Sequence, residues 1–455
     1  MKRIKNIAIG RMIIAGLFIL SAGVVFYLND INITFLIVLF FLTYYIKGLR
    51  KKTDPDYLAL SFLFTLSFAC LIWGKNLGLD PYSSTVIALA ILVNVLYMDS
   101  EFSFAYLFFI CILSSVIFEY DFKIFIIYLV AGSTAIFLSI NVRKRFDIIK
   151  AGFLAGFMQF LMVAGFMSFS APFSFVQPLR LSLLTGMISS VVVIGFLTIF
   201  EHLLGVVTNI SLLELSDFNH PLLRRMILEA PGTYQHSLVV ANLAEAAAEA
   251  VGANSLLARV GAYYHDIGKI SKSEYFSENQ MLSGYKDKHK NLTPAMSKLI
   301  IMNHVKEGVE LAKKYNLNKK IIDFISQHHG TTLVYYFFRR AQEIKPTETE
   351  SEDVYRYPGP KPMSKEVALV HLADTIEASS RALEEATPAR IKEMVREAIL
   401  NKFLDGQLDE TELTLRDLEK VAEIFTRMLN AMFHTRVDYP KPQDPDANNK
   451  PSSSE

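Results

Sequence analysis

The stretch His265-Asp266-Ile267-Gly268-Lys269 is the most specific short motif of the chain, and a larger set of histidines and aspartates surrounds it. The chain has ten histidines, and half of them belong to this set. Its members are His236, His265, Asp266, His304, His328, His329 and Asp374. Each lies in a stretch whose composition predicts helix, where an imidazole that faces the core needs a polar partner. The motif therefore predicts an all-α domain built around a polar site.

The spacing of this set indicates metal ligands. The intervals are 29 residues from His236 to His265, 39 to His304, 24 to His328, and 45 from His329 to Asp374, which fit ligands on successive packed helices. Neutral imidazole and carboxylate are both unprotonated near neutral pH, and an adjacent His-Asp pair can serve two ions. Two such ions can hold a bridging water as hydroxide and stabilise the charge on a phosphoester. The set predicts a two-metal phosphohydrolase.

The donor types also bear on the metal. The set contains no thiolate, which disfavours a structural zinc site. Mixed nitrogen and oxygen donors with open positions suit iron or manganese better than magnesium. The other five histidines are interpreted as ordinary core or surface residues, and they are His202, His220, His289, His371 and His434.

Two further parts of the chain are candidates for substrate contact, namely Lys269 and a loop that contains Arg356, Tyr357 and Lys361. Lys269 is four residues beyond His265, so we expect both on one helix face, with the ammonium reaching a phosphate oxygen; the alternative is a solvent-exposed lysine. Residues 345–364 break the helical pattern with the stretch Tyr355-Arg356-Tyr357-Pro358-Gly359-Pro360-Lys361-Pro362. This loop is either a surface connection or a substrate-binding loop, in which Arg356, Tyr357 and Lys361 would contact phosphate and base.

The first 200 residues read as a polytopic membrane domain. Half of all residues are apolar, 34 are Phe, and the mean hydropathy is positive. Most apolar runs approach the length that crosses about 30 Å of hydrocarbon. The pattern predicts eight spans, with seven as the fallback, over residues 12–28, 33–46, 57–73, 83–98, 102–118, 122–140, 149–169 and 178–200.

Basic residues in the short connections predict the orientation. They gather in alternate connections, namely Lys2, Arg3, Lys5 and Arg11, then Lys47, Arg50, Lys51 and Lys52, then Arg143, Lys144, Arg145 and Lys150. The other connections hold at most one each, at Lys75, Lys123 and Arg180. This asymmetry predicts a cytoplasmic N-terminus and a cytoplasmic second half. The pair Gly152 and Gly156 is weak evidence for helix association and thus for a homodimer.

The second half reads as helices with short connections. We expect an all-helical domain over residues 205–438 after a membrane domain over 1–200. The segment 439–455 is rich in Pro, Asp, Asn and Ser, and we expect a disordered tail there. The membrane half either anchors the enzyme or takes part in sensing.

Several motifs together resemble a known family. They are Gly232-Thr233-Tyr234-Gln235-His236-Ser237, His265-Asp266-x-Gly268-Lys269, His328-His329-Gly330-Thr331, Tyr357-Pro358-Gly359-Pro360-Lys361-Pro362 and Leu372-Ala373-Asp374. With the multi-span half before them, they resemble the seven-transmembrane receptors with an intracellular HD hydrolase, the PgpH-type cyclic-di-AMP phosphodiesterases of bacterial plasma membranes. By that resemblance the seven residues are ligands of two iron or manganese ions, bridged by Asp266.

The resemblance implies hydrolysis of cyclic-di-AMP to pApA, in which a metal-activated hydroxide attacks phosphorus and Lys269 assists, with no nucleic acid polymer as partner. Other HD hydrolases act on cyclic-di-GMP or guanosine polyphosphates, and a non-catalytic nucleotide receptor is a further alternative. Family members carry a large extracellular domain after the first span. Here only Asn29-Asp30-Ile31-Asn32 occupies that position, which puts the receptor part of the family's role in doubt.

Overall fold

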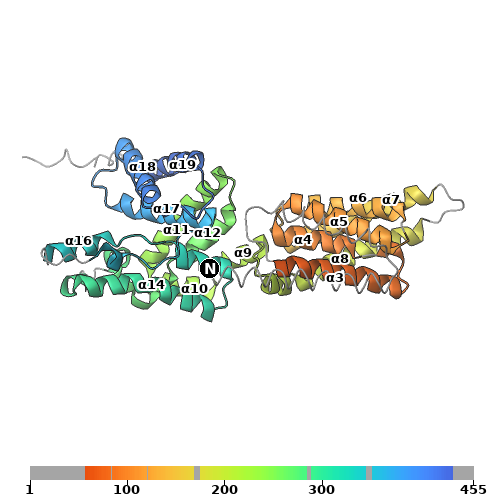
Figure 1. Cartoon of the computed structure of the whole chain (residues 1–455), viewed down its shortest axis with the longest axis horizontal. Helices are drawn as coiled ribbons and strands as arrows, with labels where there is room; N and C mark the ends of the chain where they lie inside the picture. The colour runs from red at the N-terminus through yellow and green to blue at the C-terminus, as the bar shows by residue number, and fades with distance from the viewer. Residues whose placement is uncertain are drawn as a thin grey trace, which may run out of the picture. The chain divides into compact units, whose positions relative to one another are not determined.

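The computed structural model describes residues 57–83, 85–119, 121–168, 175–283, 288–344 and 351–433, and every regular element in these ranges is a helix (Figure 1). The α-helices are α3 (Tyr57–Asn76), α4 (Val86–Tyr97), α5 (Ser100–Ile117), α6 (Phe122–Leu138), α7 (Arg145–Met167), α8 (Val176–Leu204), α9 (Asn209–Leu215), α10 (Pro221–Glu229), α11 (Pro231–Ala250), α12 (Ser255–Tyr264), α13 (Ser277–Ser283), α14 (Pro294–Lys314), α15 (Lys319–Gln327), α16 (Tyr335–Ile344), α17 (Lys365–Arg381), α18 (Pro388–Leu404) and α19 (Leu415–Phe433). Short 3-10 helices are η1 (Pro81–Ser83), η2 (Ile267–Tyr275), η3 (Lys288–Asn291) and η4 (Glu352–Tyr355).

The predicted fold class is confirmed, since the chain is helical both in its apolar half and in its polar half. The spans predicted at 12–28 and 33–46, the connection at 29–32, His434 and the tail at 439–455 lie outside the described residues. Two compact units are present. The first holds the apolar helices up to Arg224 together with Glu310–Asp323, and the second holds the rest of the polar half.

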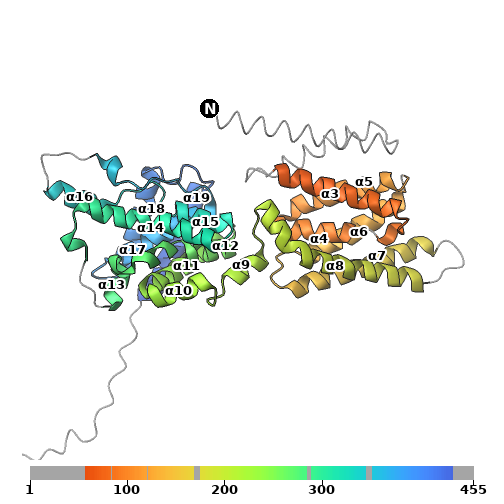
Figure 2. The same ribbon diagram turned by 90° about the horizontal axis from the view of Figure 1, so that it is seen from below.

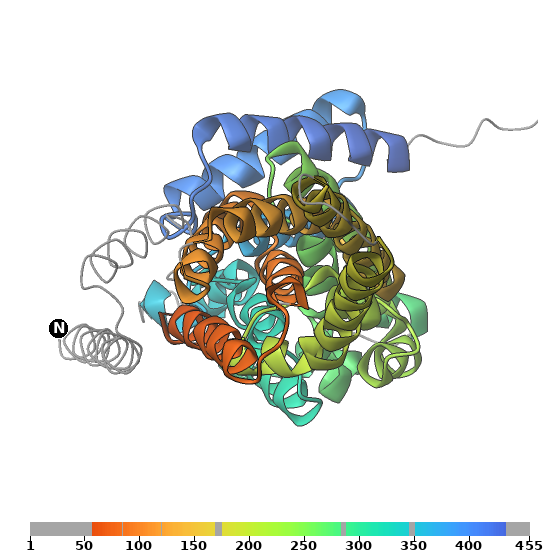
Figure 3. The same cartoon turned by 90° about the vertical axis from the view of Figure 1, so that its right-hand side faces the viewer.

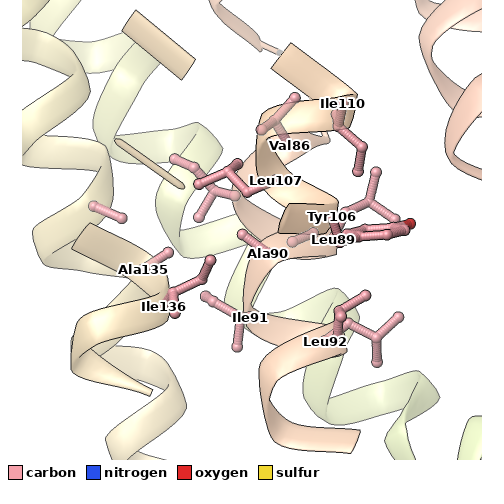
Figure 4. Close-up of a cluster of buried hydrophobic side chains, with 14 of the residues drawn as sticks. Val86, Leu89, Ala90, Ile91, Leu92, Tyr106, Leu107, Ile110, Ala135 and Ile136 are labelled. Atoms are coloured by element: carbon pink, nitrogen blue, oxygen red, sulfur yellow. The ribbon is translucent and has the colours of Figure 1, made fainter. Parts of the chain in front are cut away.

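The apolar helices of the first unit surround α4. Every residue of α4 except Tyr97 is buried, and the helix packs against α5, α6, α7 and α8 (Figure 3). Val86, Leu89 and Ile91 contribute to this core, facing residues such as Leu107 of α5 and Ile136 of α6 (Figure 4). The side-chain amide of Asn94, also buried, donates to the carbonyl of Ile136 at 3.1 Å. A buried amide inside an apolar bundle thus has its hydrogen-bond partner.

Three helices among the described residues are long and apolar enough to cross a membrane, namely α5, α7 and α8. The apolar helices α4 and α6 are shorter. These helices and α3 coincide with the last six predicted spans within a few residues, while the total of eight spans stays a prediction.

The pair Gly152 and Gly156 on α7 packs against α8 of the same chain. A Cβ on Gly152 would lie 2.4 Å from the carbonyl oxygen of Gly186 on α8, and a Cβ on Gly156 would lie 2.5 Å from that of Ser182. Glycines at these positions let the two backbones touch. The pair therefore explains the close packing of α7 on α8, and it carries no evidence for a homodimer.

The second unit is built around α11. This helix packs against α12, α13, α17 and α19 (Figure 2), and its buried residues are mostly small, namely Gly232, Thr233, Ser237, Ala241, Ala244, Ala247 and Ala248. Small side chains on α11 allow its neighbours to approach closely, which brings residues from distant parts of the sequence together.

Candidate metal centre

His236 lies in the second turn of α11. Pro231 stands at the first position of this helix, where its missing N–H costs no hydrogen bond. The next two backbone N–H groups, of Gly232 and Thr233, donate to the side-chain oxygen of Asn279 at 2.8 and 3.1 Å. The start of α11 is thereby fixed, and the His236 side chain is buried.

His265 and Asp266 lie where α12 ends and η2 begins. The prediction that His265 and Lys269 share the face of one α-helix is wrong, because α12 ends at Tyr264 and the chain continues as a 3-10 helix from Ile267. Gly268 lies where η2 contacts α14. A Cβ at this position would lie 1.8 Å from the backbone oxygen of His304, so only glycine allows η2 to lie directly on α14.

The remaining members of the set come from three more helices. His304 lies in the middle of α14, His328 and His329 follow the end of α15, and Asp374 lies within α17. The structure brings all seven residues together in two groups that share Asp266. The ligand atoms within each group lie within 4.8 Å of one another, and the groups are His236, His265, Asp266 and Asp374, and Asp266, His304, His328 and His329.

The two oxygens of Asp266 face different groups. Oδ2 lies 3.2 Å from Nε2 of His265 and 3.6 Å from Nε2 of His236. Oδ1 lies 3.3 Å from Nε2 of His304 and 3.5 Å from Nε2 of His328. This is the arrangement that a carboxylate needs in order to bridge two cations.

Hydrogen bonds to the Nδ1 atoms set the tautomers of four imidazoles. Nδ1 of His265 donates to the carbonyl of Ala262 at 2.6 Å, that of His328 donates to the carbonyl of Ile325 at 3.0 Å, and that of His304 donates to the carbonyl of Ile301. In His236, Nδ1 lies 2.6 Å from the carboxylate of Glu377. Such bonds orient imidazole ligands, and in His265, His304 and His328 they leave Nε2 unprotonated and available to a metal.

The Nε2 atoms of His304 and His328 face each other, and neither carries a proton. Nε2 of His304 and Nε2 of His328 are 3.3 Å apart, and both rings carry their proton on Nδ1. Two facing lone pairs repel unless a cation lies between them. Two further buried atoms have no hydrogen-bond donor, namely Nε2 of His265 and Oδ1 of Asp266. The donor set therefore fits two divalent cations.

The electrostatics of the centre keep its carboxylates charged. Burial by itself would raise the pKa of Asp266, but the Lys269 ammonium and the His265 imidazole hold this pKa well below its usual range. Burial would lower the pKa of His236, yet its hydrogen bonds to Asp374 and Glu377 raise it to about 10. A metal ion on Nε2 of His236 must displace that proton, so metal binding would release a proton.

Lys269 reaches the centre despite its different local structure. Its ammonium lies 2.7 Å from Oδ2 of Asp266 and 2.9 Å from Oε1 of Glu278, and its side chain is only 12% exposed. The interpretation as a solvent-exposed lysine is therefore excluded.

The three predicted substrate contacts have different surroundings. Tyr357 stacks on the His329 ring, with centroids 4.4 Å apart and planes 24° apart. Arg356 instead pairs with Asp405 at 2.9 Å and donates to the carbonyl of Thr331. Lys361 lies 3.3 Å from a carboxylate oxygen of Asp409. The structure thus brings Tyr357 to the metal centre, while both cations are held by the loop that follows α18.

Three residues of the centre were missed at the level of sequence. Glu377 contacts His236, Glu278 contacts Lys269, and Asn279 fixes the start of α11. His371, interpreted as an ordinary core or surface residue, lies in the core, and its Nδ1 donates to the backbone oxygen of His328. Glu377 follows Asp374 by three residues, which places both on one helix face, and this spacing was the one available signal.

Replacing Glu377 by alanine is expected to weaken metal binding by about 10–100-fold, because partners of ligating imidazoles typically contribute that much. Isothermal titration of the metal-free chain with Mn²⁺ measures the effect. Arg381→Ala is the matched control, since Arg381 pairs with the other oxygen of Glu377 and leaves the bond to His236 in place. Equal affinities in wild type and Glu377→Ala would contradict this role.

Known proteins resemble this chain in both halves. The model of the 7TM receptor with intracellular HD hydrolase matches residues 12–208, and that of the HD domain matches residues 233–379. The cyclic-di-AMP phosphodiesterase PgpH of Bacillus subtilis is 40% identical over 326 residues, which are 71% of this chain and 45% of that protein. The protein of the same name in Listeria monocytogenes is 38% identical over 363 residues, which are 78% of this chain and 50% of that protein.

The chain spans about half the length of the curated relatives it matches. Among solved structures, the HD domain of L. monocytogenes PgpH in complex with cyclic-di-AMP is 45% identical. The match covers 48% of this chain and 100% of the solved domain, with a TM-score of 0.45.

Proposed function

This chain belongs to the family of 7TM receptors with an intracellular HD hydrolase, and on this premise we propose that it is a membrane-bound phosphodiesterase that hydrolyses cyclic-di-AMP to pApA.

The bridging geometry of Asp266 is the observation that carries the proposal. Its two oxygens face two groups of histidines at 3.2–3.6 Å, and Nε2 of His304 faces Nε2 of His328 at 3.3 Å. Divalent ions held in both groups would supply a water of lowered pKa as hydroxide and neutralise charge on the phosphate. Iron or manganese suits these mixed nitrogen and oxygen donors.

The residues around the ligands would orient the substrate. The Tyr357 ring lies against His329, at the border of the second group, where it can contact a base or ribose. The Lys269 ammonium lies beside Asp266 and can contact a phosphate oxygen from there. The full cysteine-free donor set supports an enzyme more than a receptor that only binds, because binding alone does not require seven ligands.

The adenine substrate is proposed from the relatives that bear the name cyclic-di-AMP phosphodiesterase. The cytoplasmic orientation of the polar half is proposed from the basic connections near Lys144 and Arg145. A cytoplasmic site would have access to a soluble nucleotide messenger.

The test is turnover by the detergent-solubilised full chain, reconstituted with Mn²⁺ or Fe²⁺. We expect conversion of cyclic-di-AMP to pApA at a higher kcat/KM than for cyclic-di-GMP, and complete loss of turnover after chelation with recovery on adding metal back. Preference for a guanine nucleotide would overturn the substrate. Tight binding of cyclic-di-AMP without turnover would overturn the enzyme in favour of a receptor.

A further inference from the structure

The Lys269 ammonium occupies a position that conflicts with a metal ion. It lies 2.7 Å from Oδ2 of Asp266, the oxygen that faces His236 and His265. A divalent ion bound through this oxygen would stand close to the ammonium, and the two positive charges would repel each other strongly in a buried site. Lys269 therefore needs a second anion if a metal is to share Asp266 with it.

Glu278 is that anion. Among the described residues, Asp266 and Glu278 are the two carboxylates in ion-pair contact with Lys269, and Glu278 lies 2.9 Å from the ammonium. The Glu278 side chain is 11% exposed, so the pair is shielded from water. The ring of Phe276, with its centroid 5.1 Å from the ammonium, adds a cation–π contact in the same region.

Glu278 is itself held firmly by α11. Its Oε1 accepts a hydrogen bond from the Thr233 hydroxyl at 3.2 Å. Its backbone lies so close to Gly232 that a Cβ there would be 2.1 Å from the Glu278 carbonyl oxygen. Thr233 precedes His236 by one turn, so the helix that presents a metal ligand also fixes the partner of Lys269.

We infer that Glu278 is a positioning residue of the metal centre: it holds the Lys269 ammonium beside the cation position of the His236 group and so allows a divalent ion to bind there. The inference rests on the metal-binding part of the proposed function. Without the Glu278 charge, the ammonium has Asp266 as its one remaining carboxylate partner and competes with the metal for it.

The experiment measures Mn²⁺ binding to the metal-free full chain, without nucleotide, by titration with electron paramagnetic resonance detection of free Mn²⁺. Glu278→Gln keeps the size of the side chain and removes its charge. We expect one of two bound ions to weaken by about 10–100-fold, as for other partners of metal ligands, and the second ion to be unaffected. Glu274→Gln is the control that removes a carboxylate charge from η2, where Glu274 pairs with Lys288 at 3.4 Å, and its binding should stay close to that of wild type.

The decisive variant is Lys269→Met combined with Glu278→Gln. Removing the competing ammonium should return Mn²⁺ affinity to near the wild-type value, which a misfolded or merely destabilised variant would not do. Wild-type affinity in Glu278→Gln, or affinity in the double variant as weak as in the single one, would overturn the inference. Absence of Mn²⁺ binding by the wild-type chain would instead overturn the proposed function.

Discussion

Replacing Asp266 by alanine is expected to abolish cyclic-di-AMP hydrolysis and to remove both metal ions at once. Its Oδ2 faces His236 and His265, and its Oδ1 faces His304 and His328, so one substitution takes a ligand from each group. Metal ions contribute several kcal/mol to transition-state stabilisation, which corresponds to a loss of about 10³-fold or more in rate. Metal content by elemental analysis and kcat on cyclic-di-AMP together measure the effect.

The matched control is Asp353→Ala, which removes an exposed carboxylate from η4 in the same unit. It should keep both metals and normal turnover. Loss of only one ion in Asp266→Ala, with the other bound as in wild type, would contradict the bridging role and indicate two independent sites.

The metal centre was largely predictable because its residues are chemically unusual where they stand. Buried histidines need polar partners, and four buried histidines with the partly exposed His329, together with Asp266 and Asp374, indicate a shared site in one domain. The structure assembles all seven from five separate parts of the sequence. Helical periodicity alone could not place Lys269, because it did not show that α12 ends at Tyr264 and that a 3-10 helix follows.

The supporting residues were not predictable in the same way. Glu278 and Glu377 are two of 45 acidic residues, and the one local signal is that Glu377 follows Asp374 by three residues. Their roles follow from the packing of α13 and α17 on α11, which is a tertiary property. The structural role of a buried charged residue can be recognised only when the residue that pairs with it is known.

The membrane half shows a similar limit. Apolar runs predicted where helices lie, since length and composition suffice for that. They could not identify α4 as the buried centre of the bundle, because a helix that faces lipid and one that faces other helices are equally apolar. The pair Gly152 and Gly156 suggested association between chains, whereas its partner is Gly186 of the same chain.

Gly268→Ala is expected to damage the metal centre although it removes no ligand. A Cβ at this position would lie 1.8 Å from the backbone oxygen of His304 and 2.6 Å from the backbone nitrogen of Gly308. Backbone atoms cannot rotate away as a side chain can, so η2 and α14 must separate, and Asp266 must move away from His304. Overpacking of this kind costs about 3 kcal/mol or more, which lowers the melting temperature of a domain of about 200 residues by roughly 6–12 °C.

The measurement combines thermal unfolding of the metal-free chain with Mn²⁺ titration of the folded protein. Gly195→Ala on α8 is the matched control, because a Cβ there meets no atom within 4 Å, and it should change neither property. Mn²⁺ affinity in Gly268→Ala should fall more for the group that contains His304 than for the group that contains His236, since the clash acts on α14. A variant that unfolds at the wild-type temperature and binds two ions normally would show that η2 and α14 tolerate separation, and the glycine of the His-Asp-x-Gly-Lys motif would then need an explanation other than packing.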